Sequence, residues 1–381
     1  MTSGVFTPDR LGFILARQPH PRMRDYQCMQ RHLLFATQLY ALPILRPLAD
    51  AIRAAGHEVA WFVAAPLAAR LRPDERRLEH ADEVRAFAPL AVFSASNSVP
   101  HFFPGVKVQV FHGFNADKRP PRRGHFRIRN QFDLYCTQGP ATTIPFRELA
   151  NKYRHFAVVE TGWPKLDPLF GADDGSAAAL RPAQERPVVM YAATFTEHLT
   201  SARTLYAEIA RQIASGERYW LLTLHPKIDP ELIARYKALA GPNARYLEAD
   251  MLVPMLRAAE VLVSDTSSVV SEFAVQCKPV ITLRNRAPKP HMLDITSPAQ
   301  LEGALRSAFA PSPGLLALLR SHADDVHPFR DGRSGERVLA AAGAFARGEL
   351  GAIERKPINL WRKLRTRLRY LRWTDPVTPD R

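Results

Sequence analysis

Histidines and a lysine follow short apolar runs of this sequence, where they could bind or transfer a phosphoryl group. His112 and Gly113 end one such run, and His225 and Lys227 end another. A histidine can act as a general base because its ordinary pKa lies near neutrality. A second histidine beside a lysine suits the oxygens of a phosphate, and a glycine allows close approach of a substrate. For each histidine alone, a well-paired side chain in a solvated turn remains the simpler interpretation.

A hydroxyl-rich turn is the sharpest local feature. It consists of Asp265, Thr266, Ser267 and Ser268, which open a predicted helix. Hydroxyls and the free N–H groups of a helix N-terminus together form an anion site. The same residue types are preferred helix caps, so capping is the competing interpretation of the turn. Glu272, one turn further on, could bind a sugar or ribose hydroxyl or simply face solvent.

Alternating short strands and helices are predicted to position these residues. Strands are expected at 33–35, 59–63, 91–93, 107–111, 132–136 and 158–160, and then at 188–191, 220–224, 261–263 and 280–283. Helices are expected at 42–55, 202–214, 251–259 and 269–277. Ligands of open parallel sheets bind beyond the carboxyl ends of the strands, where the candidate residues fall.

The fold class that follows is α/β, with two doubly wound Rossmann-like halves facing a central cleft. We predict an N-terminal acceptor-side domain over 1–170 and a polar, proline-punctuated linker over 171–187. A donor domain is predicted over 188–345, followed by a basic tail over 346–381.

Composition narrows the class of protein. The 381 residues are 46% hydrophobic and 23% charged, which excludes a disordered chain or a small disulfide scaffold. Three dispersed cysteines argue for a reducing compartment and against a structural zinc site. The net charge of +15 attracts polyanions such as nucleic acid, anionic lipid or phosphate-rich substrates. No run of 18 apolar residues is present, so we expect no membrane-spanning helix.

The tail carries a large share of the basic charge. Eight Lys or Arg residues lie in 355–372, with leucines at helical spacing and aromatic residues nearby: Leu360, Leu364, Leu368, Leu371, Trp361, Tyr370 and Trp373. This pattern predicts a basic amphipathic helix. It could bind an anionic membrane surface peripherally, or it could pack across the two domains. Both alternatives stay open at this point.

Several common catalytic motifs are missing from the sequence. It contains no H-E-x-x-H, P-loop, G-x-G-x-x-G or nucleophile elbow. The motifs that it does contain occur in a fixed order: Phe111-His112-Gly113, Gly162 to Asp167, Tyr191 to Phe195, Leu224-His225-Pro226, Val263 to Val269 with Glu272-Phe273, and Lys278-Pro279-Val280. Over roughly 105–300, this series resembles the CDP-glycerol glycerophosphotransferase family, the teichoic-acid primases and polymerases of bacterial envelopes.

The resemblance implies a GT-B fold with an inter-domain active site. It implies transfer of glycerol phosphate from CDP-glycerol to a hydroxyl of an envelope glycan or lipid-linked acceptor, with release of CMP. By match of motif, His112 would be the base and His225 would contact the donor pyrophosphate. The donor site would be lined by Thr194, Asp265, Thr266, Ser267, Ser268 and Glu272, to which we add Gly113 and Lys227.

The cofactor and location follow from the same resemblance. We expect no protein-held metal, although magnesium could arrive with the nucleotide donor. We expect a cytoplasmic enzyme on the inner face of the cell membrane.

Two departures from the family pattern leave the donor open. Lys165 stands where the family has arginine, and Ala193 and Thr196 replace the usual neighbours of the Thr-Phe pair. Another polyol phosphate is therefore possible. So is a nucleotide sugar, which would make the protein a GT-B glycosyltransferase of capsule or lipopolysaccharide synthesis. A non-catalytic polyanion-binding protein is less favoured, because the basic residues concentrate in the tail and no nucleic-acid module is present.

Overall fold

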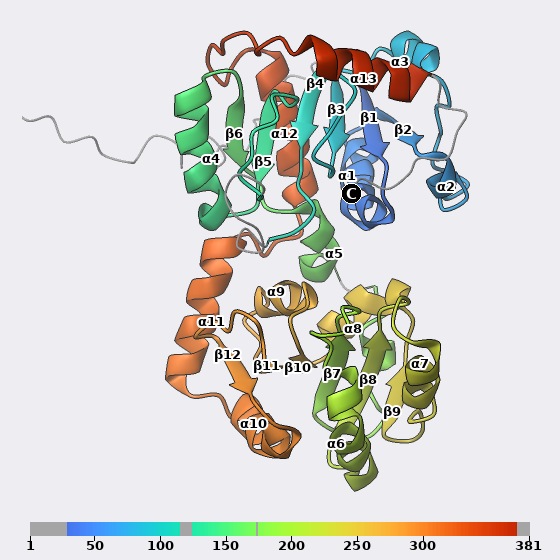
Figure 1. Ribbon diagram of the computed structural model, residues 1–381, viewed down its shortest axis with the longest axis vertical. Coiled ribbons are helices and arrows are strands. Elements are labelled where there is room, and N and C mark those ends of the chain that lie inside the picture. Colours follow the sequence, from blue (N-terminus) through green and yellow to red (C-terminus); the bar gives the residue numbers. More distant parts are fainter. Residues whose placement is uncertain (1–28, 115–123, 173, 372–381) are drawn as a thin grey trace, which may run out of the picture.

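The computed structural model describes residues 29–114, 124–172 and 174–371, and Figure 1 shows them as two halves, one above the other. The N-terminal half contains a six-stranded sheet in the order β2-β1-β3-β4-β5-β6, and every pairing is parallel. Its strands are β1 (Arg31–Ala36), β2 (Glu58–Val63), β3 (Ala91–Ser94), β4 (Val106–Gln109), β5 (Leu134–Thr137) and β6 (Ala157–Glu160).

The C-terminal half repeats this architecture, with the parallel order β12-β11-β10-β7-β8-β9. Its strands are β7 (Val188–Ala193), β8 (Tyr219–Leu224), β9 (Ala244–Tyr246), β10 (Val261–Ser264), β11 (Val280–Leu283) and β12 (Met292–Ile295). All ten predicted strands are present. The sequence prediction lacked β9 and β12, which are short edge strands with partly exposed residues.

Helices cover both faces of each sheet. In the N-terminal half they are α1 (Leu42–Ala54), α2 (Ala65–Ala68), α3 (Ala81–Phe87), α4 (Pro140–Tyr153) and α5 (Asp167–Phe170). The later ones are α6 (Ala202–Ser215), α7 (Pro230–Lys237), α8 (Leu252–Ala258), α9 (Val269–Ala274), α10 (Leu301–Phe309), α11 (Pro313–Val326), α12 (Ser334–Ala346) and α13 (Leu360–Leu371). Leu45, Leu48 and Ile52 of α1 are fully buried, as their helical spacing predicts.

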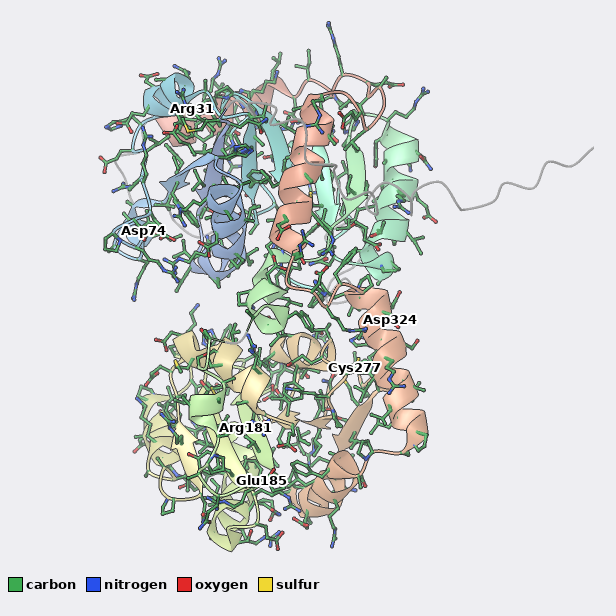
Figure 2. The ribbon with its side chains drawn as sticks, turned by 180° about the vertical axis from the view of Figure 1, so that it is seen from behind. Arg31, Asp74, Arg181, Glu185, Cys277 and Asp324 are labelled. Carbon is green, nitrogen blue, oxygen red and sulfur yellow. The ribbon has the colours of Figure 1, made fainter. Side chains whose placement is uncertain are left out.

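The chain returns to the N-terminal half after the second sheet. Helix α12 packs against α1, and Figure 2 shows it lying over the N-terminal sheet when the molecule is seen from behind. Asp167, at the start of α5, holds the beginning of α12 by accepting hydrogen bonds from the backbone N–H groups of Ser334 and Gly335 (2.8 and 2.6 Å). The predicted donor domain, 188–345, thus includes a helix that belongs by packing to the other half.

The predicted linker over 171–187 is partly packed rather than free. It contains a short 3-10 helix, Ala178–Leu180, that contacts α8, and Leu180 is buried. Arg181 and Glu185 lie on the C-terminal half in Figure 2. The domain boundaries themselves remain predictions, since packing does not follow them residue by residue.

The carboxyl edges of the two sheets meet at the boundary between the halves. Strand β6 leads into Lys165, and strand β10 leads into α9, which contains Glu272. The Nζ atom of Lys165 lies 2.5 Å from Oε1 of Glu272. All strands within each sheet are parallel, so the carboxyl ends of β4, β7 and β8 are at these same two edges.

Candidate active site

His112 lies at the N-terminal side of this boundary, just beyond β4. Its side chain is exposed, and the ring of Tyr40 stands 5.2 Å away. Its Nδ1 atom is 3.0 Å from the carbonyl oxygen of Ala95. A carbonyl oxygen can only accept, so Nδ1 must carry the proton. In the neutral ring, Nε2 is therefore the basic nitrogen, which is what a general base requires.

His225 lies at the C-terminal side of the boundary, just beyond β8. Its Nδ1 atom has the opposite hydrogen-bonding role to that of His112. Its Nδ1 accepts a hydrogen bond from the backbone N–H of Lys227 (3.1 Å). In the neutral ring the proton is then on Nε2, which can donate to an anion. Burial, and then the Lys227 cation, lower the pKa of His225 below 6.5, which favours this neutral form. The two site histidines are thus set up for opposite tasks.

An aromatic ring joins His225 and Lys227 into one surface. Phe195, two residues beyond β7, is 47% exposed, and its ring centroid lies 4.4 Å from that of His225. The Nζ atom of Lys227 lies 5.5 Å from the same ring. Thr194, the preceding residue, is half-buried. The structure therefore brings Thr194, His225 and Lys227 to one edge, as predicted.

Asp265 departs from its predicted role of lining the donor site. Its side chain is fully buried and points into the C-terminal half. The carboxylate accepts hydrogen bonds from the backbone N–H of Thr194 (3.0 Å) and from the N–H and hydroxyl of Ser201 (2.8 and 2.9 Å). Burial raises the pKa of Asp265, and these donors oppose the shift. Its geometry is that of a positioning residue for the Thr194 turn.

The other three residues of the turn remain accessible to different degrees. Thr266 and Ser267 are half-buried and Ser268 is exposed. The Thr266 hydroxyl accepts from the backbone N–H of Arg286 (2.9 Å). The following helix, α9, is only six residues long and ends at Ala274, three residues before the predicted end. A helix this short has a weak dipole, so the hydroxyls and backbone N–H groups must provide most of any anion binding.

Glu272 neither faces solvent nor presents a free carboxylate. It is 4% exposed, and its Oε1 pairs with Lys165 of the N-terminal half. The Nζ atom of Lys165 also lies 5.3 Å from the ring centroid of buried Trp163. The solvent-facing alternative for Glu272 is therefore wrong, and a hydroxyl ligand would have to share the carboxylate with Lys165.

Gly113 is held by a residue that the sequence analysis missed. Buried Gln138, two residues beyond Cys136, donates from Nε2 to the Gly113 carbonyl oxygen (2.9 Å). The position of Gln138 just after a predicted strand was the sequence signal that could have placed it at the sheet edge.

A glycine is also required at position 162. The φ of Gly162 is +78°, and a Cβ atom there would lie 2.4 Å from the Ser334 hydroxyl.

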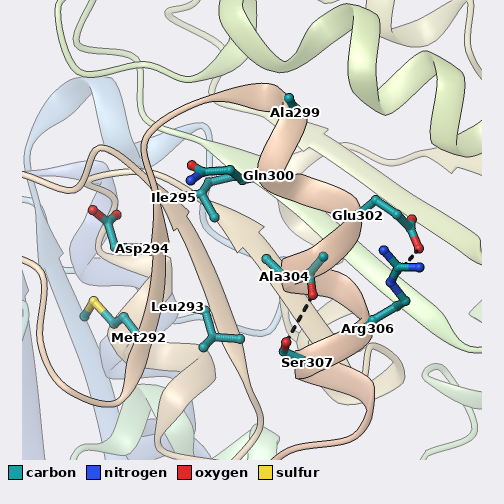
Figure 3. Close-up of a pocket in the computed structure, with 11 residues that line it drawn as sticks. Met292, Leu293, Asp294, Ile295, Ala299, Gln300, Glu302, Ala304, Arg306 and Ser307 are labelled. Atoms are coloured by element: carbon teal, nitrogen blue, oxygen red, sulfur yellow. Dashed lines mark hydrogen bonds and ion pairs between the residues drawn. The ribbon is translucent and has the colours of Figure 1, made fainter.

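Other features of the described residues lie away from this site. They contain no group of three or more His, Cys, Asp or Glu side chains arranged to hold a metal ion. A groove of about 640 Å³ lies between β12 and α10 (Figure 3). It is at the outer edge of the C-terminal sheet, and none of the predicted site residues lines it.

Comparison with known proteins supports the family resemblance. The sequence model of the CDP-Glycerol:Poly(glycerophosphate) glycerophosphotransferase family matches residues 103–285, which include every predicted site residue. The chain is 25% identical over 147 residues to the teichoic acid glycerol-phosphate primase of Bacillus subtilis (strain 168). That alignment covers 36% of this chain and 38% of the primase. The matching family is one of enzymes, as the resemblance implied.

Solved structures confirm the predicted GT-B fold. A structure of the wall teichoic acid polymerase TagF has a TM-score of 0.58 at 14% identity, covering 84% of this chain and 90% of its own. A putative UDP-N-acetylglucosamine 2-epimerase from Listeria monocytogenes has a TM-score of 0.61 at 16% identity, covering 87% of this chain and 100% of its own. At these identities the likeness concerns the fold alone.

Proposed function

We propose that this chain transfers glycerol phosphate, or a related polyol phosphate, from a CDP-activated donor to a hydroxyl of an envelope glycan or lipid-linked acceptor. The family match over 103–285 carries the choice of reaction. The different tautomers of His112 and His225 support it. Phosphoryl transfer needs one group that accepts the proton of the acceptor hydroxyl and one group that donates a hydrogen bond to the leaving phosphate. No observation favours a nucleotide sugar as donor.

The step uses each histidine once. The acceptor hydroxyl gives its proton to Nε2 of His112, and its oxygen attacks the phosphorus that bears the polyol. The bond between this phosphorus and the bridging oxygen breaks, and CMP leaves with the electron pair. Nε2–H of His225, the Lys227 ammonium and the hydroxyls of the 266–268 turn stabilise the charge on the leaving phosphate. The proton on His112 is then lost to solvent.

A direct assay tests this proposal. The protein is incubated with CDP-glycerol and a lipid-linked acceptor, and CMP is measured over time. Acceptor-dependent CMP release is expected, and it should fall sharply in His112→Ala. The same assay with CDP-ribitol and UDP-sugars tests the donor. Transfer from a UDP-sugar with none from either CDP-polyol would overturn the proposed chemistry and support a glycosyltransferase.

Magnesium would reach the site only as part of the complex with the nucleotide donor. We propose that any divalent ion is held by the donor pyrophosphate, because no ligand cluster was found in the described part of the chain. Chelation by EDTA should then lower the affinity for the donor. It should leave the thermal unfolding of the donor-free protein unchanged.

Peripheral attachment to a membrane is the second part of the proposal. Helix α13 lies at the end of the N-terminal half that is far from the C-terminal half (Figure 1). Four of its apolar side chains face outward: Leu360, Trp361, Leu364 and Leu368 are between 50% and 76% exposed. Arg362, on the opposite face, donates to the backbone carbonyls of Arg129 and Asn130.

This orientation disfavours the alternative in which the helix packs its leucines across the two domains. A bilayer interface would cover the exposed apolar face, and basic residues at its margin would attract anionic lipid. No helix within the described residues has the length and apolar character needed to cross a bilayer. Flotation with anionic vesicles tests the attachment.

A further inference from the structure

A cationic cavity lies at the edge of the N-terminal sheet opposite the candidate active site. It has a volume of about 350 Å³ and lies between the sheet and α13. Lys107, at the amino end of β4, and Asp133, just before β5, line its floor. Lys356, Arg362 and Lys363, from the C-terminal segment, line its other side. Since these strands are parallel, this amino edge faces away from His112.

Cationic side chains outnumber carboxylates in the lining of this cavity. Four cationic side chains line it, and Asp133 is the one carboxylate among the described residues that do so. That carboxylate is already engaged twice. Its Oδ2 accepts from the backbone N–H of Lys107 (2.7 Å), and its Oδ1 lies 2.5 Å from Nζ of Lys356. The net positive charge of the cavity is therefore not neutralised by the protein side chains that line it.

Burial makes this charge costly. Lys107 is 8% exposed, and burial lowers its pKa to about 8. Burial also lowers the pKa of Lys356, against the pull of Asp133. Nε2 of His101, which also lines the cavity, is buried and has no partner within the described residues. Cations and an unpaired ring nitrogen around one space are arranged to receive an anion.

We propose that this cavity binds the phosphate group of a phosphorylated ligand at a site separate from the transferase centre. Lys107, Lys356 and Lys363 supply the charge, and the ring of His101 supplies a further hydrogen bond. The volume accommodates a phosphate with a small substituent. The group could belong to a lipid head group, since the cavity lies beneath α13, or to a soluble phosphate ester. The inference does not depend on the proposed transferase activity.

A pair of charge-matched variants of the full chain tests the site. Lys363→Gln removes a cation that lines the cavity, whereas Arg365→Gln removes an exposed cation of the same helix that does not. Binding of inorganic phosphate and pyrophosphate is measured by calorimetry. We expect about tenfold weaker binding in Lys363→Gln, the value of one charge-assisted hydrogen bond, and little change in Arg365→Gln. His225→Gln identifies any binding at the transferase centre, and it should leave the cavity unaffected.

The ring of His101 reports directly on occupancy of the cavity. Burial, and then the charges of Arg367 and Lys363, lower its pKa in the unbound protein. A bound phosphate should raise the pKa of His101, as followed by NMR and assigned with His101→Gln. Equal phosphate affinity in the two charge variants, together with an unmoved His101 signal, would overturn the proposal.

Vesicles distinguish the two sources of the phosphate. Phosphatidylcholine vesicles are compared with and without phosphatidate in a sedimentation assay. Weaker phosphatidate-dependent binding of Lys363→Gln than of Arg365→Gln assigns the site to a lipid head group. Equal vesicle binding, with the difference seen only for inorganic phosphate and pyrophosphate, assigns it to a soluble ester. If the two variants differ in neither assay and the His101 signal does not move, the cavity does not bind phosphate.

Discussion

Two backbone groups decide the tautomer of each site histidine. The Ala95 carbonyl holds the proton on Nδ1 of His112, and the Lys227 N–H takes up the lone pair of Nδ1 in His225. Neither partner can reverse its role, because a carbonyl has no proton to give and an amide N–H has no lone pair to offer. The proposed roles of base and hydrogen-bond donor therefore rest on local backbone geometry.

Glutamine substitutions separate these two roles. An amide can donate a hydrogen bond but cannot take up a proton at neutral pH. His112→Gln should lower kcat by about 10²–10⁴-fold, the usual contribution of a general base. His225→Gln keeps a donor and should cost less than about tenfold. Initial rates of CMP release measure both, and a larger loss in His225→Gln would reverse the assignment.

A buried histidine away from the site predicts acid sensitivity. His32 is fully buried, and neither ring nitrogen has a partner within the described residues. Burial, and then the nearby His57, lower its pKa from 6.5 to about 4. The unfolded chain binds the proton first as pH falls, so stability should be lost between about 6.5 and 4 and not above 6.5. At pH 5.5 the loss should be about 1 kcal/mol.

His32→Leu removes this titration and should flatten the pH dependence by that amount. Urea unfolding at pH 7.5 and pH 5.5 measures it, with His80→Leu as the exposed control. The same pH dependence in wild type and His32→Leu would show that the ring is not held neutral.

At the scale of elements, sequence patterns predicted the strands and what lies beyond their ends. Short β-branched and aromatic runs are sufficient to locate strands, and parallel topology then collects their carboxyl ends. The placement of His112, His225 and the 266–268 turn follows from that. Helices α10, α11 and α12 were not predicted, although Ser312 and Pro313 at the start of α11 are an ordinary helix-start signal.

The orientation of the acidic side chains could not be predicted in this way. Asp265 turns inward because its partners at Thr194 and Ser201 are 71 and 64 residues away in sequence. Glu272 is occupied because Lys165, 107 residues away, reaches it from the other half. Pairings of this range depend on tertiary packing, which residue type and spacing alone do not specify.

The Lys165–Glu272 pair joins the two halves, and its removal should be felt in stability. Lys165→Met would leave a 4% exposed carboxylate unpaired and should lower the free energy of unfolding by about 3 kcal/mol. The double variant Lys165→Met, Glu272→Leu should recover most of this loss. Lys237→Met breaks an exposed pair with Glu248 and should cost less than about 0.5 kcal/mol. Urea unfolding distinguishes these values, and equal losses for both lysines would contradict a buried inter-domain pair.

Helix α12 has its own anchor, which can be tested separately. Arg333 precedes the helix without a capping side-chain bond, and Asp167 supplies both acceptors from a distant segment. Asp167→Ala should destabilise the protein by about 1–2 kcal/mol, the value of a helix cap. Asp167→Asn keeps one good acceptor and should cost less. Thermal unfolding compares them, and no difference from wild type in Asp167→Ala would show that α12 is held by packing alone.

At the scale of the whole molecule, the candidate sites for phosphate-bearing ligands lie at two distant places. One is the boundary between the sheets, where His225 and Lys227 stand. The other is the far end of the N-terminal half, where α13 and the cationic cavity lie. The net charge of +15 on the whole chain favours the approach of phosphate-bearing ligands to both places. Separation of the two places lets membrane attachment and transfer be altered independently.

The outward face of α13 gives the prediction that distinguishes attachment from catalysis. Trp361 is 75% exposed and Leu364 is 50% exposed, so replacing both by serine should leave folding intact. Burying each side chain in a bilayer interface is worth about 1.5–3 kcal/mol, so the double variant should bind anionic vesicles at least about tenfold more weakly. CMP release with a water-soluble acceptor should be unchanged.

Leu318→Ser provides the matched control for this experiment, because Leu318 is 43% exposed on α11, away from α13. Its vesicle binding should equal that of wild type. The residual binding of the α13 double variant should come from basic residues and should weaken further as salt is raised, since exposed charges are screened over about 10 Å at 0.1 M. Wild-type affinity in the double variant would mean that the apolar face of α13 is covered by something other than lipid.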